Sequence, residues 1–66
     1  MTLGERIGNL RRDAGYSQEY VAESLGVSRQ AVSKWENGSS EPSTTNLIAI
    51  GKLYEIPPEE LLKELI

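Results

Sequence analysis

Only three residues, Gly26-Val27-Ser28, separate two segments whose apolar side chains recur at helical spacing, over about residues 18–25 and 29–36. A link this short forces two helices to cross steeply, which is the geometry of a helix-turn-helix. Gly26 can take a positive φ in the turn without steric cost. The small side chain of Ala22, one turn earlier, lets the two helices approach closely. Residues 17–38 are therefore predicted to form a helix-turn-helix.

The rest of the chain also shows helical spacing, and no stretch alternates polar and apolar residues as a strand would. Thr2 can cap a first helix and Gly15 can end it. Pro58 suits the first turn of a last helix. The fold class is therefore predicted to be all-α, with five short helices in one domain over residues 1–66. Besides the two above, the helices are expected at about 2–14, 44 or 45–54 and 58–65.

Three glycines lie inside these predicted helices, where each costs up to ~1 kcal/mol relative to alanine. Gly51 is expected to have a closely packed neighbour. Gly4 and Gly8 are four apart on the first helix. We expect both to be tolerated on the surface; a close contact with another helix is the alternative.

The residue types that are absent narrow the function. The chain has no Cys and no His, which excludes a disulfide scaffold, a zinc finger, a thiol nucleophile and a His-based catalytic centre. Apolar runs are only a few residues long, and charges stand where a signal peptide needs an apolar stretch. The composition thus predicts a protein that is not an enzyme, binds no metal or cofactor, spans no membrane and resides in the cytoplasm.

The net charge of −3 argues mildly against nucleic acid when the chain is taken as a whole. Its distribution changes this interpretation. Residues 1–40 carry five basic and five acidic side chains, whereas residues 41–66 carry two basic and five acidic ones. The first two thirds are neutral overall and can still present one basic face.

The helix over 29–36 has an apolar side and a polar side. Val32 and Trp35 are expected to anchor it to the first two helices. The opposite side then carries side chains suited to base edges in the major groove. Arg and Lys pair with guanine, Gln pairs with adenine, and the Ser hydroxyl can either donate or accept. Every amphipathic helix has a polar face, but here it follows a tight turn of the right length. The candidate base-contacting residues are Arg29, Gln30, Ser33 and Lys34.

Residues 3–65 resemble the lambda-repressor/Cro-type helix-turn-helix domain, also called the xenobiotic-response-element family. The resemblance rests on matched runs with correctly placed loops. These runs are Ser17-Gln18-Glu19, Val21-Ala22, Leu25-Gly26-Val27-Ser28, Arg29-Gln30-Ala31-Val32-Ser33-Lys34-Trp35-Glu36-Asn37-Gly38, Pro42, Leu47 and the stretch 56–62.

The resemblance implies a five-helix domain that binds double-stranded operator DNA, usually as a symmetric dimer. Gln18 would donate to a phosphate and brace Gln30. Arg11 would pair with Glu36 and tie the first helix to the end of the third. Further phosphate contacts are expected from Ser28, Asn37, Ser39 and Ser40.

Two departures from the family pattern are visible. Many relatives carry Glu where this chain has Tyr20, so the second helix is expected to be capped by Ser17 alone, with the tyrosine ring used for packing. The loop Ser39-Ser40-Glu41 lacks the basic residue often found there, so contacts would rely on neutral donors.

The last predicted helix carries more apolar residues than one short helix can bury, and exposed apolar patches often mark interfaces. A homodimer contact over residues 56–66 is therefore expected, through Leu61, Leu62, Leu65 and Ile66. The leading hypothesis is a repressor that binds a palindromic operator as a dimer. The alternative is an antitoxin or other protein-interaction module, whose acidic last third would dock a basic protein partner.

Overall fold

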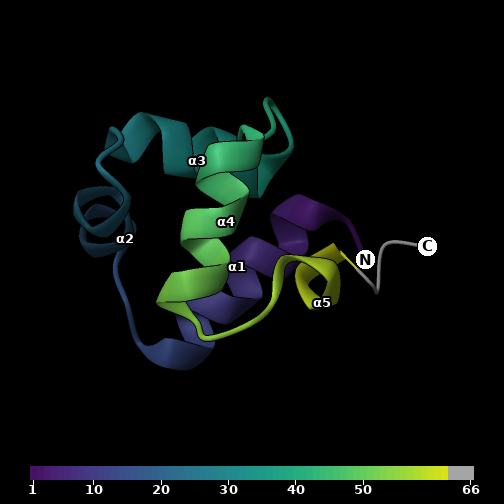
Figure 1. The fold of residues 1–66 in the computed structure, drawn as a ribbon. Helices are drawn as coiled ribbons and strands as arrows, with labels where there is room; N and C mark the ends of the chain where they lie inside the picture. Colours follow the sequence, from purple (N-terminus) through teal and green to yellow (C-terminus); the bar gives the residue numbers. More distant parts are fainter. Residues whose placement is uncertain (63–66) are drawn as a thin grey trace.

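The computed structural model describes residues 1–62, apart from the side chain of Pro58, and these residues form five α-helices and no strand. The all-α prediction is confirmed, and the first four helices match their predicted bounds within one residue. Residues 63–65 of the predicted last helix lie outside the described residues. The helices are α1 (Leu3–Ala14), α2 (Gln18–Leu25), α3 (Arg29–Asn37), α4 (Thr44–Leu53) and α5 (Pro58–Leu62) (Figure 1).

Hydroxyl side chains start the first four helices. Thr2, Ser17, Ser28 and Ser43 each stand in extended backbone and accept a hydrogen bond from the backbone N–H three residues on. At α1 the Glu5 carboxylate also accepts from the Thr2 N–H at 2.9 Å, which completes a capping box and lowers the pKa of Glu5. At α2 Ser17 caps alone, as the presence of Tyr20 predicted.

The same four helices end with one hydrogen-bond pattern, the Schellman motif. After α1, α2 and α3 the left-handed position is a glycine, with φ of 75°, 71° and 82° at Gly15, Gly26 and Gly38. After α4 it is Glu55, with φ of 57°. The Glu55 N–H donates to Lys52 and the Ile56 N–H to Gly51 at 2.7 Å. Helix α4 therefore ends like the others, but without the glycine.

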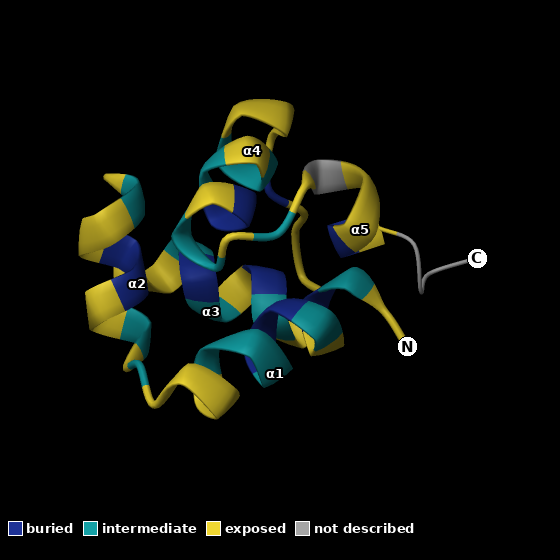
Figure 2. Cartoon of the chain, turned by 60° about the horizontal axis from the view of Figure 1, so that its bottom comes forward, coloured by how far each residue is buried: buried dark blue, intermediate teal, exposed yellow. Residues whose placement is uncertain are grey.

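The core lies where the five helices meet, and every helix contributes to it. The buried apolar residues are Ile7, Val21, Ala22, Val32, Trp35, Ile50 and Leu61. Figure 2 shows the buried segments turned toward one another, with the exposed segments on the outer sides. In both views α5 lies near the start of α1 (Figures 1 and 2).

Leu61 corrects one prediction. It was expected at a dimer contact, but it is fully buried within this chain (0% exposed) and belongs to the core. Leu62, its neighbour, is 39% exposed. Successive helix residues point in directions about 100° apart, so only one of the two can face the core. Leu65 and Ile66 lie outside the described residues.

Gly4 corrects a second prediction, because it is buried and not on the surface. A Cβ atom there would lie 2.9 Å from the carbonyl oxygen of Glu36 and closer still to that of Trp35. The backbone of α1 thus rests directly on the end of α3. Gly8 is also buried, but its Cβ would meet only the flexible guanidinium of Arg12, at 3.1 Å. Gly51 is buried, in agreement with the packing expected around it.

Candidate nucleic-acid interface

Helix α3 is divided into a buried and an exposed side. Val32 is 0% and Trp35 is 5% exposed, and these two side chains fix the rotation of the helix about its axis. Of the four candidate base-contacting residues, three are exposed and one is half-buried. The exposed residues are Arg29, Gln30 and Lys34, and the half-buried one is Ser33. The structure therefore presents donors of three side-chain types on the outer side of a firmly held helix.

An open depression of about 480 Å³ lies where α2 and α3 begin, lined by Arg11, Ser17, Gln18, Glu19 and Arg29. The first backbone N–H groups of a helix have no partner within the helix, and its start carries partial positive charge. Two helix starts and the Arg29 guanidinium therefore border one depression, whereas the charge of Arg11 is balanced by Glu36 and the Glu19 carboxylate is the opposing charge. This arrangement favours an anion such as a phosphate.

An ion pair joins the end of α1 to the end of α3. The Arg11 Nε donates to Glu36 Oε2 at 2.7 Å, and Arg11 Nη2 donates to Glu36 Oε1 at 3.0 Å. Arg11 Nη1 also donates to the carbonyl oxygen of Tyr16 at 3.0 Å. The two side chains are only 15% and 10% exposed, and Glu36 raises the pKa of the Arg11 guanidinium. The structure thus contains the pair that the family resemblance implies, in a bidentate geometry.

Gln18 has a different partner from the one expected. The resemblance implies a contact with Gln30, but the Gln18 Nε2 donates to Glu36 Oε1, at 3.3 Å. Glu36 is half-buried in the last turn of α3, whereas Gln30 lies exposed in its first turn. Sequence spacing could not distinguish the two, because the crossing of α2 and α3 decides which turn Gln18 meets.

The loop after α3 is held by its backbone and leaves side-chain donors exposed. The backbone N–H groups of Ser39 and Ser40 both donate to the Lys34 carbonyl, and Asn37 Oδ1 accepts from the Ser39 N–H at 2.9 Å. The Asn37 amide nitrogen and both serine hydroxyls lie in exposed residues. Ser28 is exposed at the start of α3, where its oxygen caps Ala31 and its hydroxyl hydrogen can still be donated.

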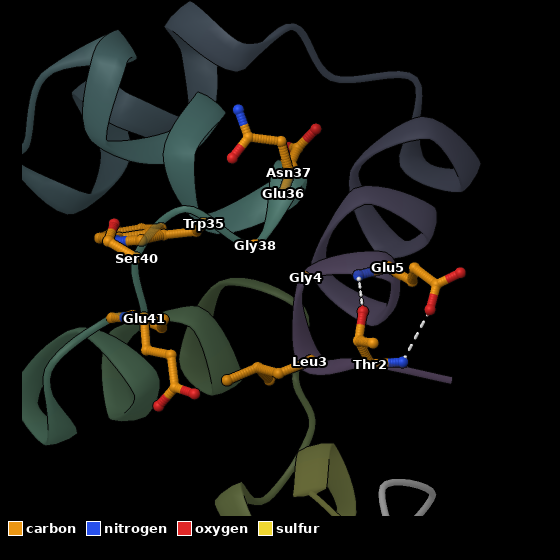
Figure 3. Close-up of a pocket in the computed structure, with 11 residues that line it drawn as sticks. Thr2, Leu3, Gly4, Glu5, Trp35, Glu36, Asn37, Gly38, Ser40 and Glu41 are labelled. Atoms are coloured by element: carbon orange, nitrogen blue, oxygen red, sulfur yellow. Dashed lines mark hydrogen bonds between the residues drawn. The ribbon is translucent and has the colours of Figure 1, made fainter.

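A second pocket, of about 440 Å³, lies between the start of α1 and the end of α3 with its following loop (Figure 3). Its lining includes the donors Asn37 and Ser40, but also the carboxylate residues Glu5 and Glu41. Like charges disfavour a phosphate here. The depression at the helix starts is therefore the better anion site. Within residues 1–62 no group of three metal-ligating side chains occurs, and no helix is long and apolar enough to cross a membrane.

Three tyrosines pack together beside the Arg11–Glu36 pair. The ring centroids of Tyr16 and Tyr20 are 4.5 Å apart, and those of Tyr16 and Tyr54 are 6.0 Å apart in a stacked arrangement. Tyr20 therefore packs, as expected, although it is 48% exposed. The Tyr54 hydroxyl is buried and has no hydrogen-bond partner within residues 1–62, and burial raises the pKa of Tyr54 to about 12.

Comparison with known proteins agrees with this architecture. A family model described as helix-turn-helix matches residues 7–61. The chain belongs to the lambda-repressor/Cro-type helix-turn-helix family. Members of this family are DNA-binding transcriptional regulators and not enzymes.

Among its curated relatives, the HTH-type transcriptional regulator DicA of Escherichia coli is 39% identical over 62 residues. The HTH-type transcriptional activator BcrR of Enterococcus faecalis is 41% identical over 62 residues. The chain spans only part of these relatives: the matches cover 94% of it in both cases but 46% of DicA and 30% of BcrR.

Among solved structures, the P22 c2 repressor protein in complex with synthetic operator 9T superposes with a TM-score of 0.88 at 36% identity. The superposition covers 96% of each chain. The helix-turn-helix family fold is thus shared over nearly the whole length of the chain.

Proposed function

We propose that this chain is the sequence-specific DNA-binding domain of a transcriptional regulator, with α3 inserted in the major groove. The division of α3 carries this proposal, since Val32 and Trp35 fix the helix while Arg29, Gln30 and Lys34 face outward. Arg and Lys suit guanine O6 and N7, and Gln suits adenine N6 and N7. The operator complex of the structurally similar P22 c2 repressor supports this function.

The remaining polar groups would set affinity and register on the DNA backbone. In this proposal the Gln18 amide and the start of α2 meet one phosphate at the depression. The hydroxyl of Ser28 and the loop donors of Asn37, Ser39 and Ser40 meet others. Half-buried Ser33 contacts a base only where the groove comes close to the helix.

The protein acts, in this proposal, as a homodimer on a palindromic operator with half-sites about 34 Å apart, and represses by blocking polymerase. Leu62 supports a dimer contact within 56–66, since its apolar side chain is 39% exposed on α5. Leu65 and Ile66 complete the proposed contact outside the described residues. A DNA-bound regulator of this kind works in the cytoplasm. A reporter assay decides between repression and the activation that the name of BcrR indicates for that relative.

The experiment is selection from a random double-stranded DNA pool, followed by gel shifts at several salt concentrations. We expect an enriched palindrome, on which Arg29→Ala or Gln30→Ala costs about 1–3 kcal/mol and relaxes one base position. Gln18→Ala should weaken operator and random DNA alike. Lys34→Ala removes a candidate base-contacting residue of α3. Its matched control is Lys52→Ala, which removes an exposed positive charge from α4. A pool without enrichment would overturn the proposal.

The dimer contact has its own test, by equilibrium sedimentation of the wild type and of Leu62→Asp and Leu65→Asp variants. The wild type should associate, and each variant should shift the equilibrium toward monomer. A wild type that stays monomeric both alone and on operator DNA would contradict the contact.

A further inference from the structure

Glu36 is the carboxylate at the centre of the contacts between α1, α2 and α3. It accepts two hydrogen bonds from Arg11 and one, at 3.3 Å, from the Gln18 amide. Its side chain is 10% exposed, so these hydrogen bonds are partly shielded from water. A carboxylate on the proposed DNA-binding element is unexpected, because it repels phosphates unless its charge is compensated.

The geometry points to a use for this carboxylate. We propose that Glu36 is a positioning residue for DNA binding, which holds the Gln18 amide in the orientation that donates to a backbone phosphate at the start of α2. This inference rests on the proposed function. The amide nitrogen has two hydrogens, and the contact with Glu36 occupies one of them. The second is available to an anion in the depression that Gln18 lines.

Arg11 makes this arrangement compatible with DNA. Its guanidinium binds both oxygens of Glu36, so the negative charge that fixes Gln18 is neutralised within the protein. Arg11 is itself held by the Tyr16 carbonyl oxygen at 3.0 Å. The three side chains therefore form one ordered set before DNA arrives.

Pre-ordering a side chain matters because immobilising a flexible one on binding weakens affinity by about two- to tenfold. Gln18 is a long side chain at the first residue of α2, and no other hydrogen bond to it is found in the described part of the chain. Without Glu36 it would have to be ordered by the phosphate alone.

The test is a set of double-mutant cycles on the selected operator, in which Gln18→Ala is combined with three other substitutions. In the wild type we expect Gln18→Ala to weaken binding about three- to tenfold. In Glu36→Gln the penalty should persist, because the side-chain carbonyl still accepts from Gln18. In Glu36→Met, whose thioether sulfur is only a weak acceptor, the penalty should fall below about twofold.

Arg11→Met is the matched control, because it removes the same ion pair but leaves the acceptor for Gln18. The Gln18→Ala penalty should therefore persist there. Circular dichroism confirms that each variant is folded at the temperature used. An equal Gln18→Ala penalty in all backgrounds would overturn the positioning role while leaving the proposed function intact. A wild type that binds no selected DNA would overturn both.

A measurement on the wild type covers the case in which Glu36→Met does not fold. Nuclear Overhauser contacts between the Gln18 side-chain amide protons and the Glu36 methylene protons should be present in the free protein and persist on the operator. Their loss on DNA binding would show that the phosphate replaces Glu36 as the partner, contrary to the inference.

Discussion

The N-terminal part of the molecule (α1 to α3) and helix α4 of the C-terminal part (α4 and α5) end their helices with the same hydrogen bonds but with different residues. Gly15, Gly26 and Gly38 occupy the left-handed position in the first part, and Glu55 occupies it in the second. A side chain there costs about 1–2 kcal/mol, so α4 ends under strain that the other helices avoid. Ile56, which follows Glu55, packs against the core. The comparison indicates that the ends of α1 to α3 are determined by the local sequence, whereas the end of α4 is determined by tertiary packing.

The largest effect should come from removing the packing that holds the C-terminal part. Leu61 is fully buried, so Leu61→Ala should lower the free energy of unfolding by about 2–5 kcal/mol. A domain of this size has few kcal/mol to lose, so much of the variant should be unfolded. Urea denaturation followed by circular dichroism measures this. Leu62→Ala is the control, and an equal loss there would mean that α5 has been assigned the wrong inner side.

The next effect tests the N-terminal part, where α1 touches α3 through backbone atoms. Gly4→Ala should destabilise by about 1–3 kcal/mol, because its Cβ meets the carbonyl oxygens of Trp35 and Glu36. Gly8→Ala should stay within about 0.5 kcal/mol of the wild type, since the gain in helix propensity offsets a shift of Arg12. Thermal unfolding of the two variants side by side distinguishes them. Equal melting temperatures would contradict the close contact.

Tyr54 links the two parts, since it follows α4 and stacks on Tyr16 beside α1. Burial raises its pKa to about 12, above the value of 10.0 expected for an exposed tyrosine. The contribution of Tyr54 to the free energy of unfolding is therefore complete below pH ~10 and is lost as the pH rises toward 12. In this range the tyrosine hydroxyl releases its proton in the unfolded chain but keeps it in the folded one. We expect a loss of about 1 kcal/mol after allowance for partial solvent exposure. Tyr54→Phe should not show this loss of stability at high pH. A pH profile identical to that of the wild type would contradict the role of Tyr54.

The smallest effects come from exchanging the helix-ending residues themselves. Gly26→Ala should destabilise by about 1 kcal/mol, since a Cβ meets no atom there and only the backbone conformation is penalised. Glu55→Gly should stabilise by about 0.5 kcal/mol, because relief of strain is partly offset by greater freedom of the unfolded chain. Chemical denaturation of both variants shows whether each substitution raises or lowers the free energy of unfolding. If both changes destabilised, Glu55 would have a favourable role beyond its backbone conformation.

The sequence predicted most of the fold because helix ends are encoded by neighbouring residues. Ser17 marks the start of α2, and Gly26 and Ser28 define the turn between α2 and α3, without any knowledge of tertiary structure. Gly4 could not be predicted in this way, because its neighbours lie at the far end of α3. Leu61 and Leu62 have the same hydrophobicity, and only the placement of α5 decides which one is buried.

The candidate site divides similarly. The polar side of α3 follows from helical spacing once Val32 and Trp35 are taken as its anchor. The hydrogen-bond partner of Gln18 does not follow from helical spacing. Whether Gln18 meets Gln30 or Glu36 depends on how α2 crosses α3. The depression shared by Gln18 and Arg29 was missed for the same reason, since it exists only where two helix starts come together.

The contact of Gly4 with the end of α3 has a consequence for redesign. It involves main-chain atoms, and these are the same whatever side chains α3 carries on its outer face. The exposed residues 29, 30 and 34 can therefore be exchanged as a set while the helix stays in place. This chain should accept a new target sequence without a compensating change in its interior, which makes it a suitable scaffold for reprogrammed regulators.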